Sequence, residues 1–138
     1  CEAGFHESTY FVGCPNQSSF DDAHALCGGM GYAGLAQVFS QGEHDWLAAL
    51  ADGAALGDTA GLWLDLSDEA ADGDWRWADG SSPGWTAWAP GQPSAQASAD
   101  CGILVVSGDD AGMWAAGDCT TLTPLGDLGT AGFVCEQR

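Results

Sequence analysis

The residue types that carry catalysis in many proteins do not occur here in the patterns that catalysis requires. The chain has no Gly-x-Ser-x-Gly turn, no His-Glu-x-x-His helix and no glycine-rich phosphate loop. Acidic pairs such as Asp109-Asp110 are adjacent in sequence, which is a poor match to two carboxyl groups flanking a glycosidic bond. His24 and His44 have no cysteine or serine motif beside them to activate. The sequence therefore predicts a protein that is not an enzyme.

The six cysteines are the second group with possible chemistry. The chain has no Cys-x-x-Cys pair and no histidine cluster, which argues against a zinc site. An even number of cysteines in a domain of 138 residues is typical of an oxidising compartment and indicates three disulfides. We therefore expect a secreted or extracellular protein. The cysteine count alone leaves several pairings open.

Exposed aromatic side chains are the third group. Between residues 63 and 119, short aromatic-rich segments alternate with clusters of Gly, Pro, Ser and Asp, which predicts short strands around a long irregular loop. A loop of that length in a compact domain is usually functional. Trp85 and Trp88 lie in it, and an exposed indole can stack on the apolar face of a sugar without any metal.

The segments before this stretch predict one hairpin and two helices. Residues 1–14 contain the apolar run Tyr10 to Val12, which has strand character. A first helix begins after Ser19 and ends at the glycines that follow Cys27; the residues expected to share its buried face are Ala23, Leu26 and Cys27. A second helix begins at a capping box over residues 40–43 and ends at residues 52–53; its apolar stripe is Trp46, Leu47 and Leu50. Two helices followed by short strands give an α+β fold.

The strand expected over residues 61–66 places Leu64 and Leu66 on one face and Trp63 and Asp65 on the other. Asp65 is the exception among these side chains. A buried carboxylate needs a partner, for which Arg76 is the candidate, whereas a carboxylate on a wet face needs none.

The charge balance limits the partners. With 20 acidic residues against two arginines, the net charge is -18, and such a surface repels nucleic acid and anionic membranes. No run of about 18 apolar residues is present, so we expect no membrane insertion. We expect residues 1–138 to form one domain. Because the chain begins at one predicted disulfide cysteine and ends three residues beyond another, we also expect a module trimmed from a longer polypeptide.

Several motifs in this order resemble the carbohydrate-recognition domain of the C-type lectins, in its long-loop form. The family's Trp-Ile-Gly-Leu strand is similar to residues 63–66, where Asp65 stands in the place of Gly. The Trp-x-Trp strand, the Asn-Trp-x-x-Gly-Gln-Pro loop and the terminal Phe-Val-Cys-Glu are similar to residues 75–77, 87–93 and 133–136. The resemblance covers nearly the whole chain and implies the C-type lectin fold, with two helices flanking short antiparallel sheets. It also implies three disulfides: Cys27-Cys135, Cys101-Cys119 and Cys1-Cys14.

The resemblance also locates the family's principal calcium and sugar site. Its tripeptide falls on Gln92, Pro93 and Ser94, and the resemblance implies a cis peptide before Pro93. Its three remaining side-chain ligands fall on alanines: Ala99, Ala115 and Ala116. Methyl groups cannot bind a hard cation that takes oxygen ligands. We therefore expect calcium-dependent sugar binding at this position to be lost, with Trp85 and the tripeptide as ligand-binding residues. Trp88 occupies a motif position that is usually structural.

The family's auxiliary calcium site keeps acidic residues. Its positions fall on Asp68, Asp72 and Asp100, while a further position falls on Ala95. Three carboxylates at one loop base could hold calcium together with backbone carbonyls and water. The alternative is an acidic turn without an ion, since Asp and Gly are common turn residues.

Three functions therefore compete. The first is an extracellular lectin-like module that binds a glycan or a protein through the long loop. The second is an ice-binding or mineral-associated protein, for which Thr120, Thr121 and Thr123 form the one threonine cluster. The third is a structural subunit that self-associates through small residues such as those at 95–99.

Overall fold

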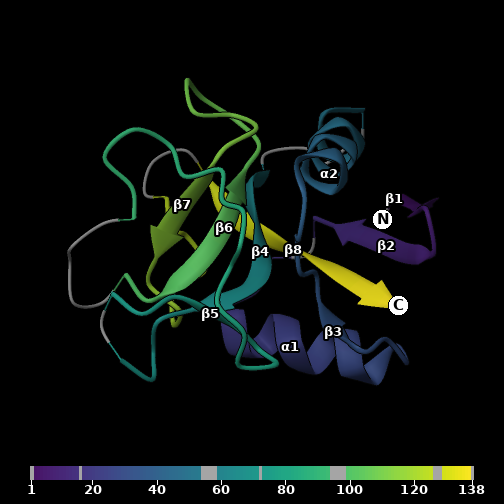
Figure 1. The fold of residues 1–138 in the computed structure, drawn as a ribbon, viewed down its shortest axis with the longest axis horizontal. Helices are drawn as coiled ribbons and strands as arrows, with labels where there is room; N and C mark the ends of the chain where they lie inside the picture. Colours follow the sequence, from purple (N-terminus) through teal and green to yellow (C-terminus); the bar gives the residue numbers. More distant parts are fainter. Residues whose placement is uncertain are drawn as a thin grey trace.

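The computed structural model describes residues 2–15, 17–53, 59–71, 73–93, 99–125 and 129–137. In this part of the chain, eight strands form one sheet in the order β1-β2-β8-β4-β6-β7, with β3 beside β8 and β5 beside β4. Two helices flank the sheet (Figure 1), which confirms the α+β fold. The elements are β1 (Glu2–His6), β2 (Thr9–Cys14), α1 (Phe20–Gly29), β3 (Gly34–Leu35), α2 (Gln41–Gly53), β4 (Thr59–Ser67), β5 (Arg76–Trp77), β6 (Cys101–Val105), β7 (Trp114–Gly117) and β8 (Thr130–Gln137).

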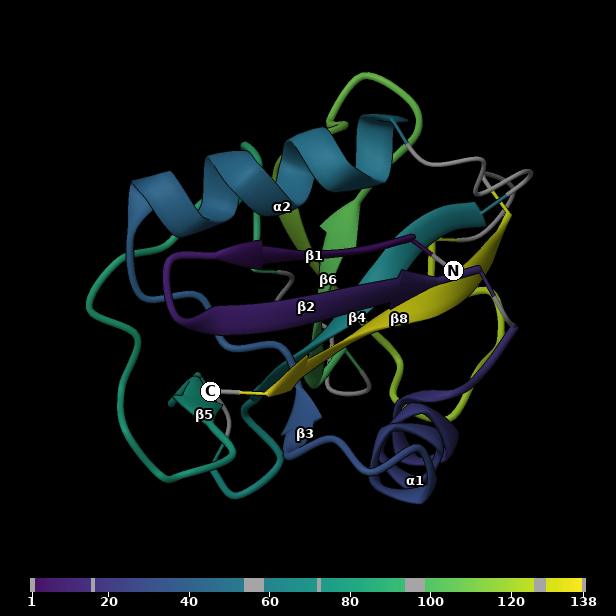
Figure 2. The same ribbon diagram turned by 90° about the vertical axis from the view of Figure 1, so that its right-hand side faces the viewer.

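The N-terminal hairpin forms as expected. Strands β1 and β2 pair antiparallel from Glu2 opposite Gly13 to His6 opposite Thr9. Figure 2 shows the hairpin beside β8, with α2 along one side and α1 on the other. The predicted Cys1-Cys14 bridge includes Cys1, which lies outside the described residues.

Helix α1 begins and ends at its sequence signals. The Ser19 hydroxyl accepts a hydrogen bond from the Asp22 amide, and Gly31 adopts a left-handed φ of 90° just after the C-cap. Ala23 and Cys27 are fully buried. The expectation for Leu26 is wrong, because this side chain is 42% exposed. The buried stripe of α1 is completed by Phe20, and Leu26 lies to one side of it.

Helix α2 begins at the predicted capping box. The Glu43 amide donates to the Ser40 hydroxyl, and a Glu43 carboxylate oxygen accepts from the Phe39 amide. Leu47 is buried, and Trp46 and Leu50 pack half-buried against the core. Neither described helix is long and apolar enough to cross a bilayer.

Strand β4 divides the core into two clusters because successive side chains point to opposite faces of the sheet. Leu62, Leu64 and Leu66 belong to the cluster beneath α2. Trp63 belongs to the other cluster, which α1 covers. Strand β8 runs parallel to β4 and antiparallel to β2, so the sheet is mixed.

Two of the three predicted disulfides lie within the described residues, and both are formed. Cys27 in α1 bonds to Cys135 in β8 across 108 residues. Cys101, at the start of β6, bonds to Cys119, just beyond β7. The first bridge ties α1 to the sheet, and the second closes the base of the long loop.

Candidate functional site

The centre of the candidate site is Trp114, the first residue of β7. Its side chain is fully buried, although it lies beside the long irregular segment between β5 and β6. Four aromatic rings surround it with centroid distances of 5.8 to 5.9 Å, and all four lie edge-on to it: His44, Trp77, Trp85 and Trp88. Edge-to-face pairs at this distance are favourable. The cluster therefore fixes the inner wall of the long loop.

Trp85 and Trp88 occupy different positions in this cluster. Trp88 lies between Trp75, at 4.9 Å, and Trp114, and the backbone around it bonds to that of Trp114 on both sides. Trp88 therefore has the structural role that its motif position predicts. Trp85 is half-buried, as Trp88 is, and its ring contacts His44 and Trp114.

The loop tripeptide has the predicted backbone and an unexpected side-chain contact. The Gln92-Pro93 peptide bond is cis, which confirms that expectation. The Gln92 amide oxygen accepts a hydrogen bond of 3.0 Å from the Ala116 backbone amide. Gln92 thus joins the long loop to β7. Ser94 lies outside the described residues.

The three alanines at the principal calcium position are buried, one just before β6 and two in β7. Ala99, Ala115 and Ala116 are each less than a tenth exposed. Their methyl groups pack where the family places carboxylate and amide oxygens, so these positions offer a cation no side-chain oxygen.

Two residues of the acidic set are close together at the base of the loop. The Asp68 amide donates to the Asp100 carbonyl at 2.9 Å, and the Asp68 Oδ2 accepts from the Gly73 amide at 2.9 Å. Asp68 is 6% exposed, and its Oδ1 is buried without a hydrogen-bond partner among the described residues. A buried carboxylate oxygen without a donor is unfavourable, and a cation would satisfy it. Asp72 lies outside the described residues.

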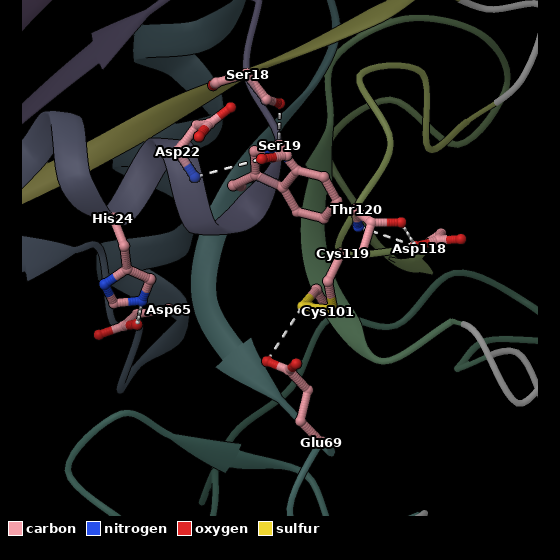
Figure 3. The surroundings of a disulfide bond; sticks show 11 residues. Ser18, Ser19, Asp22, His24, Asp65, Glu69, Cys101, Asp118, Cys119 and Thr120 are labelled. Atoms are coloured by element: carbon pink, nitrogen blue, oxygen red, sulfur yellow. Dashed lines mark hydrogen bonds and ion pairs between the residues drawn. A yellow bond between two sulfur atoms is a disulfide. The ribbon is translucent and has the colours of Figure 1, made fainter.

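A second acidic group lies beside the Cys101-Cys119 disulfide (Figure 3). The Glu69 Oε1 is 3.9 Å from the Cys101 sulfur. Glu69, Cys101 and Cys119 form the one cluster of three potential metal ligands within the described ranges. Both sulfurs are joined to each other and cannot bind a metal as thiolates. This cluster is therefore a Glu69 carboxylate packed against a disulfide, which does not form a metal site.

Asp65 is buried, and the expectation that Arg76 pairs with it is wrong. The Asp65 Oδ1 is 2.7 Å from the His24 Nε2 (Figure 3), and the Asp65 Oδ2 accepts a long hydrogen bond of 3.4 Å from the Gln37 side-chain nitrogen Nε2. Arg76 pairs instead with Asp74, two residues away. The hydrogen bond to Asp65 raises the pKa of His24 above its usual value; burial opposes this effect, and the charges of Asp65, Asp21 and Glu69 support it. No sequence motif indicates this pair, because α1 and β4 come together only in the folded domain.

His44 belongs to the aromatic cluster around Trp114, a position that no sequence motif indicated. It is 7% exposed, its Nε2 lies 2.7 Å from the Gly112 carbonyl, and its Nδ1 accepts from the Trp114 indole at 3.1 Å. Burial lowers the pKa of His44, and the bond to the Gly112 carbonyl and the charge of Asp45 partly oppose that shift. The available signal was its position in α2, one residue after the capping Glu43, where a polar side chain on the inner face needs partners.

Comparison with known proteins agrees with this architecture. A family model described as the lectin C-type domain matches residues 16–137. The human protein "C-type lectin domain family 17, member A" is 32% identical over 124 residues, which are 90% of this chain and 28% of that protein. The "Alpha-N-acetylgalactosamine-specific lectin" of Patiria pectinifera is 32% identical over 99 residues, which are 67% of this chain and 58% of that protein. The chain thus spans between about a quarter and three fifths of the length of these two relatives.

Solved structures share the fold at lower sequence identity. Human lithostathine superimposes with a TM-score of 0.81 at 23% identity, covering 99% of this chain and 97% of that chain. The carbohydrate-recognition domain of the mouse scavenger receptor C-type lectin gives a TM-score of 0.79 at 23% identity, covering 99% and 95%. With its sheet, helices, disulfides, cis-proline loop and sequence relatives in agreement, the chain belongs to the C-type lectin domain family.

Proposed function

We propose that residues 1–138 form one extracellular recognition module, which binds a glycan or a protein through the long loop around Trp85 without calcium at the principal site. Domains of this family are carbohydrate- or protein-binding modules and not enzymes. The observation that carries the proposal is a contrast between two positions at the long loop. The three alanines at the principal calcium position are apolar and buried, whereas Trp85 is partly accessible and packs edge-on against the buried Trp114.

The physical basis of the proposed binding is stacking. The apolar face of a sugar ring or of a protein side chain can pack on the accessible part of Trp85, and the edge-on contact with Trp114 and the tilted contact with His44 hold the indole before the ligand arrives. A preorganised ring loses little conformational entropy on binding. The Gln92 amide oxygen, engaged with Ala116, supports the loop in place of a calcium ion.

Two observations support an extracellular location. The two disulfides formed among the described residues are typical of oxidising compartments. Among the relatives are lectins and a mussel "Perlucin-like protein", which is 28% identical over 105 residues, covering 74% of this chain and 66% of that protein.

The experiment that tests the binding site is a glycan array probed with the domain in the presence of a chelator. We expect binding that survives the chelator. We expect Trp85→Ala to weaken it by roughly thirtyfold, because truncating a central aromatic anchor commonly costs about 2 kcal/mol. Trp85→Phe keeps a ring at the position and should retain part of the affinity.

Phe5→Ala is the matched control for that array. Phe5 is 68% exposed on β1, away from the long loop, so its loss removes an exposed aromatic ring without touching the site. Binding that needs calcium at the principal position, or that is unchanged in Trp85→Ala, would contradict the proposal.

We also propose a calcium ion at the auxiliary position. Asp68, Asp100 and Asp72 would hold it, and the ion would stabilise the base of the long loop by satisfying the buried Asp68 oxygen. The fit rests on that oxygen, which has no donor within the described residues.

A thermal melt in calcium and in chelator tests this ion. Calcium at tenfold above its Kd should add about 1.4 kcal/mol of stability. For a domain of this size, the midpoint should rise by about 4 °C. Asp68→Asn keeps an oxygen for the Gly73 amide but loses the charge, and it should abolish the rise. Asp110→Asn, an exposed acid in another loop, should not. Superimposable melts of the unaltered domain in calcium and in chelator would contradict the proposed calcium site.

The two competing functions receive less support. The Thr120 hydroxyl donates to Asp118, and the Thr121 and Thr123 hydroxyls contact each other, so the threonine cluster is engaged in its own turn. Solved type II antifreeze proteins match this chain at 20 to 23% identity, which shows the fold alone. Of the small residues expected to mediate self-association, Ala99 is buried and residues 95–98 lie outside the described ranges.

A further inference from the structure

Permanently cationic side chains are nearly absent from this domain, which limits the ligands that can bind at Trp85. The chain contains no lysine and two arginines. Arg76 donates hydrogen bonds to both carboxylate oxygens of Asp74 and to the Gly80 carbonyl, and Arg138 lies outside the described residues. An anionic ligand at this site therefore has no lysine to pair with, and the described arginine is already engaged.

The two rings that contact Trp85 are also uncharged at neutral pH. One is the indole of Trp114. The other is the imidazole of His44, whose pKa is lowered by burial and which is therefore neutral. A carboxylate or sulfate group of a ligand would be desolvated beside these rings without a cation to compensate it, which is unfavourable.

Acidic side chains follow Trp85's neighbours on two segments of the chain. Asp45 is exposed in α2 directly after His44, and its charge acts on the His44 imidazole. The Gly112 carbonyl lies 2.7 Å from the His44 Nε2, and the same loop contains the exposed Asp109 and Asp110. We call Asp45, Asp109 and Asp110 the acidic rim.

The acidic rim is close enough to Trp85 for its charge to reach a bound ligand. Consecutive Cα atoms lie about 3.8 Å apart, and the His44 and Trp85 rings are 5.1 Å apart. The Asp45 carboxylate therefore lies within about two Debye lengths of Trp85 at physiological ionic strength. At lower ionic strength the Debye length grows, and the whole net charge of -18 contributes.

We propose that the Trp85 site selects glycans by charge: it takes neutral glycans and glycans with free amino groups, and it excludes glycans that carry carboxylate or sulfate groups. Stacking on Trp85 supplies the affinity, and the acidic rim supplies the selection, because like charges repel and an ammonium group is attracted. This inference rests on the proposed function of Trp85, and it adds the class of ligand that the same site takes.

The first arm of the test measures the electrostatic potential at Trp85 without a ligand. Tryptophan fluorescence is quenched with caesium and with iodide at equal ionic strength, and each result is divided by that for N-acetyltryptophanamide. The difference between the unaltered domain and Trp85→Phe isolates the contribution of Trp85. We expect caesium to quench that contribution about twofold more effectively than iodide, because the acidic rim attracts the cation. Equal normalised quenching by the two ions would overturn the proposal.

The second arm compares matched glycans that differ only in charge, on the array and in the presence of a chelator. Each neutral glycan is set beside its sialylated or sulfated form and beside a form in which removal of an N-acetyl group frees the amine. At physiological salt we expect the anionic form to bind about threefold more weakly than the neutral form, and the amino form about threefold more tightly. Lower salt should widen both differences, because screening decreases.

Asp45→Lys tests whether the acidic rim causes the selection. It reverses one charge near Trp85, so the affinity for the anionic glycan relative to the neutral one should rise about twofold. Asp21→Lys is the matched control, because it changes the net charge equally on α1, on the other side of the sheet from α2 (Figure 2), and it should leave this ratio unchanged at physiological salt.

The outcomes separate the two proposals. Anionic glycans that bind as tightly as their neutral forms, or more tightly, would overturn the selection by charge while leaving glycan binding in place. An equal response to Asp45→Lys and Asp21→Lys would overturn the assignment of the selection to the acidic rim. Absence of binding to any glycan would reject the proposed function itself, and the quenching arm would still report the potential at Trp85.

Discussion

Replacing both cysteines of the Cys27-Cys135 disulfide with alanine is expected to lower the free energy of unfolding by about 4.7 kcal/mol, the value for a closed loop of roughly 100 residues. The bridge spans 108 residues and joins α1 to β8, so its loss releases most of the chain in the unfolded state. Small domains are stable by only about 5 to 15 kcal/mol. The variant should therefore lose between about a third and nearly all of its free energy of unfolding. Urea denaturation of the variant and the unaltered domain measures the difference.

The Cys101-Cys119 bridge provides the matched comparison. It closes only 18 residues, for which the same relation gives about 3 kcal/mol. Because Cys101 follows Asp100 directly, removing this bridge should also reduce the calcium-dependent rise in melting temperature. Removing Cys27-Cys135 should leave that rise in place wherever the domain still folds. A larger loss of stability from the shorter bridge would contradict the loop-entropy explanation.

Much of the fold was predictable from local sequence signals. Ser19 and Ser40 cap the helices that they were expected to cap, and Gly31 adopts the left-handed conformation beyond α1. The alternation along β4 separates Leu64 from Trp63 as predicted, because it depends only on strand periodicity. The two bridges and the cis bond before Pro93 followed from the family resemblance.

The parts that were not predictable depend on contacts between distant elements. Asp65 required a partner, and Arg76, nearer to it in sequence than His24, was the wrong choice because the folded domain brings α1 against β4. The position of His44 between Gly112 and Trp114 joins residues about 70 apart in sequence. The parallel pairing of β8 with β4 likewise leaves no mark in the pattern of either strand.

The features of the candidate site also divide into those that the sequence predicted and those that only the fold shows. The sequence identified Trp85 as the less constrained indole and the three alanines as positions without ligand oxygens. It did not indicate that Gln92 bonds to the backbone of Ala116 or that His44 supports Trp85. Predicting candidate ligand-binding residues needed only residue types at motif positions, whereas finding the residues that pack against them needed the folded structure.

Gly132→Ala is expected to destabilise the domain by at least about 3 kcal/mol, at the upper end of the cost of overpacking. A Cβ at this position in β8 would lie 2.2 Å from the Cys14 carbonyl oxygen and 3.0 Å from the Pro15 Cα. Both are backbone atoms, so no flexible side chain can move aside. Relief would require separating β8 from the end of β2, next to the Cys27-Cys135 bridge.

Gly28→Ala provides a control with the opposite sign. Gly28 lies in α1 with open space around the position of a Cβ, so alanine should stabilise the domain by about 0.5 to 1 kcal/mol through its helix propensity. Thermal melts of the two variants beside the unaltered domain measure both effects. Equal midpoints for Gly132→Ala and the unaltered domain would mean that β8 and the end of β2 are not held as close together as the register of the sheet requires. The position of β8 between β2 and β4 would then need revision, and with it the support that the sheet gives to the long loop.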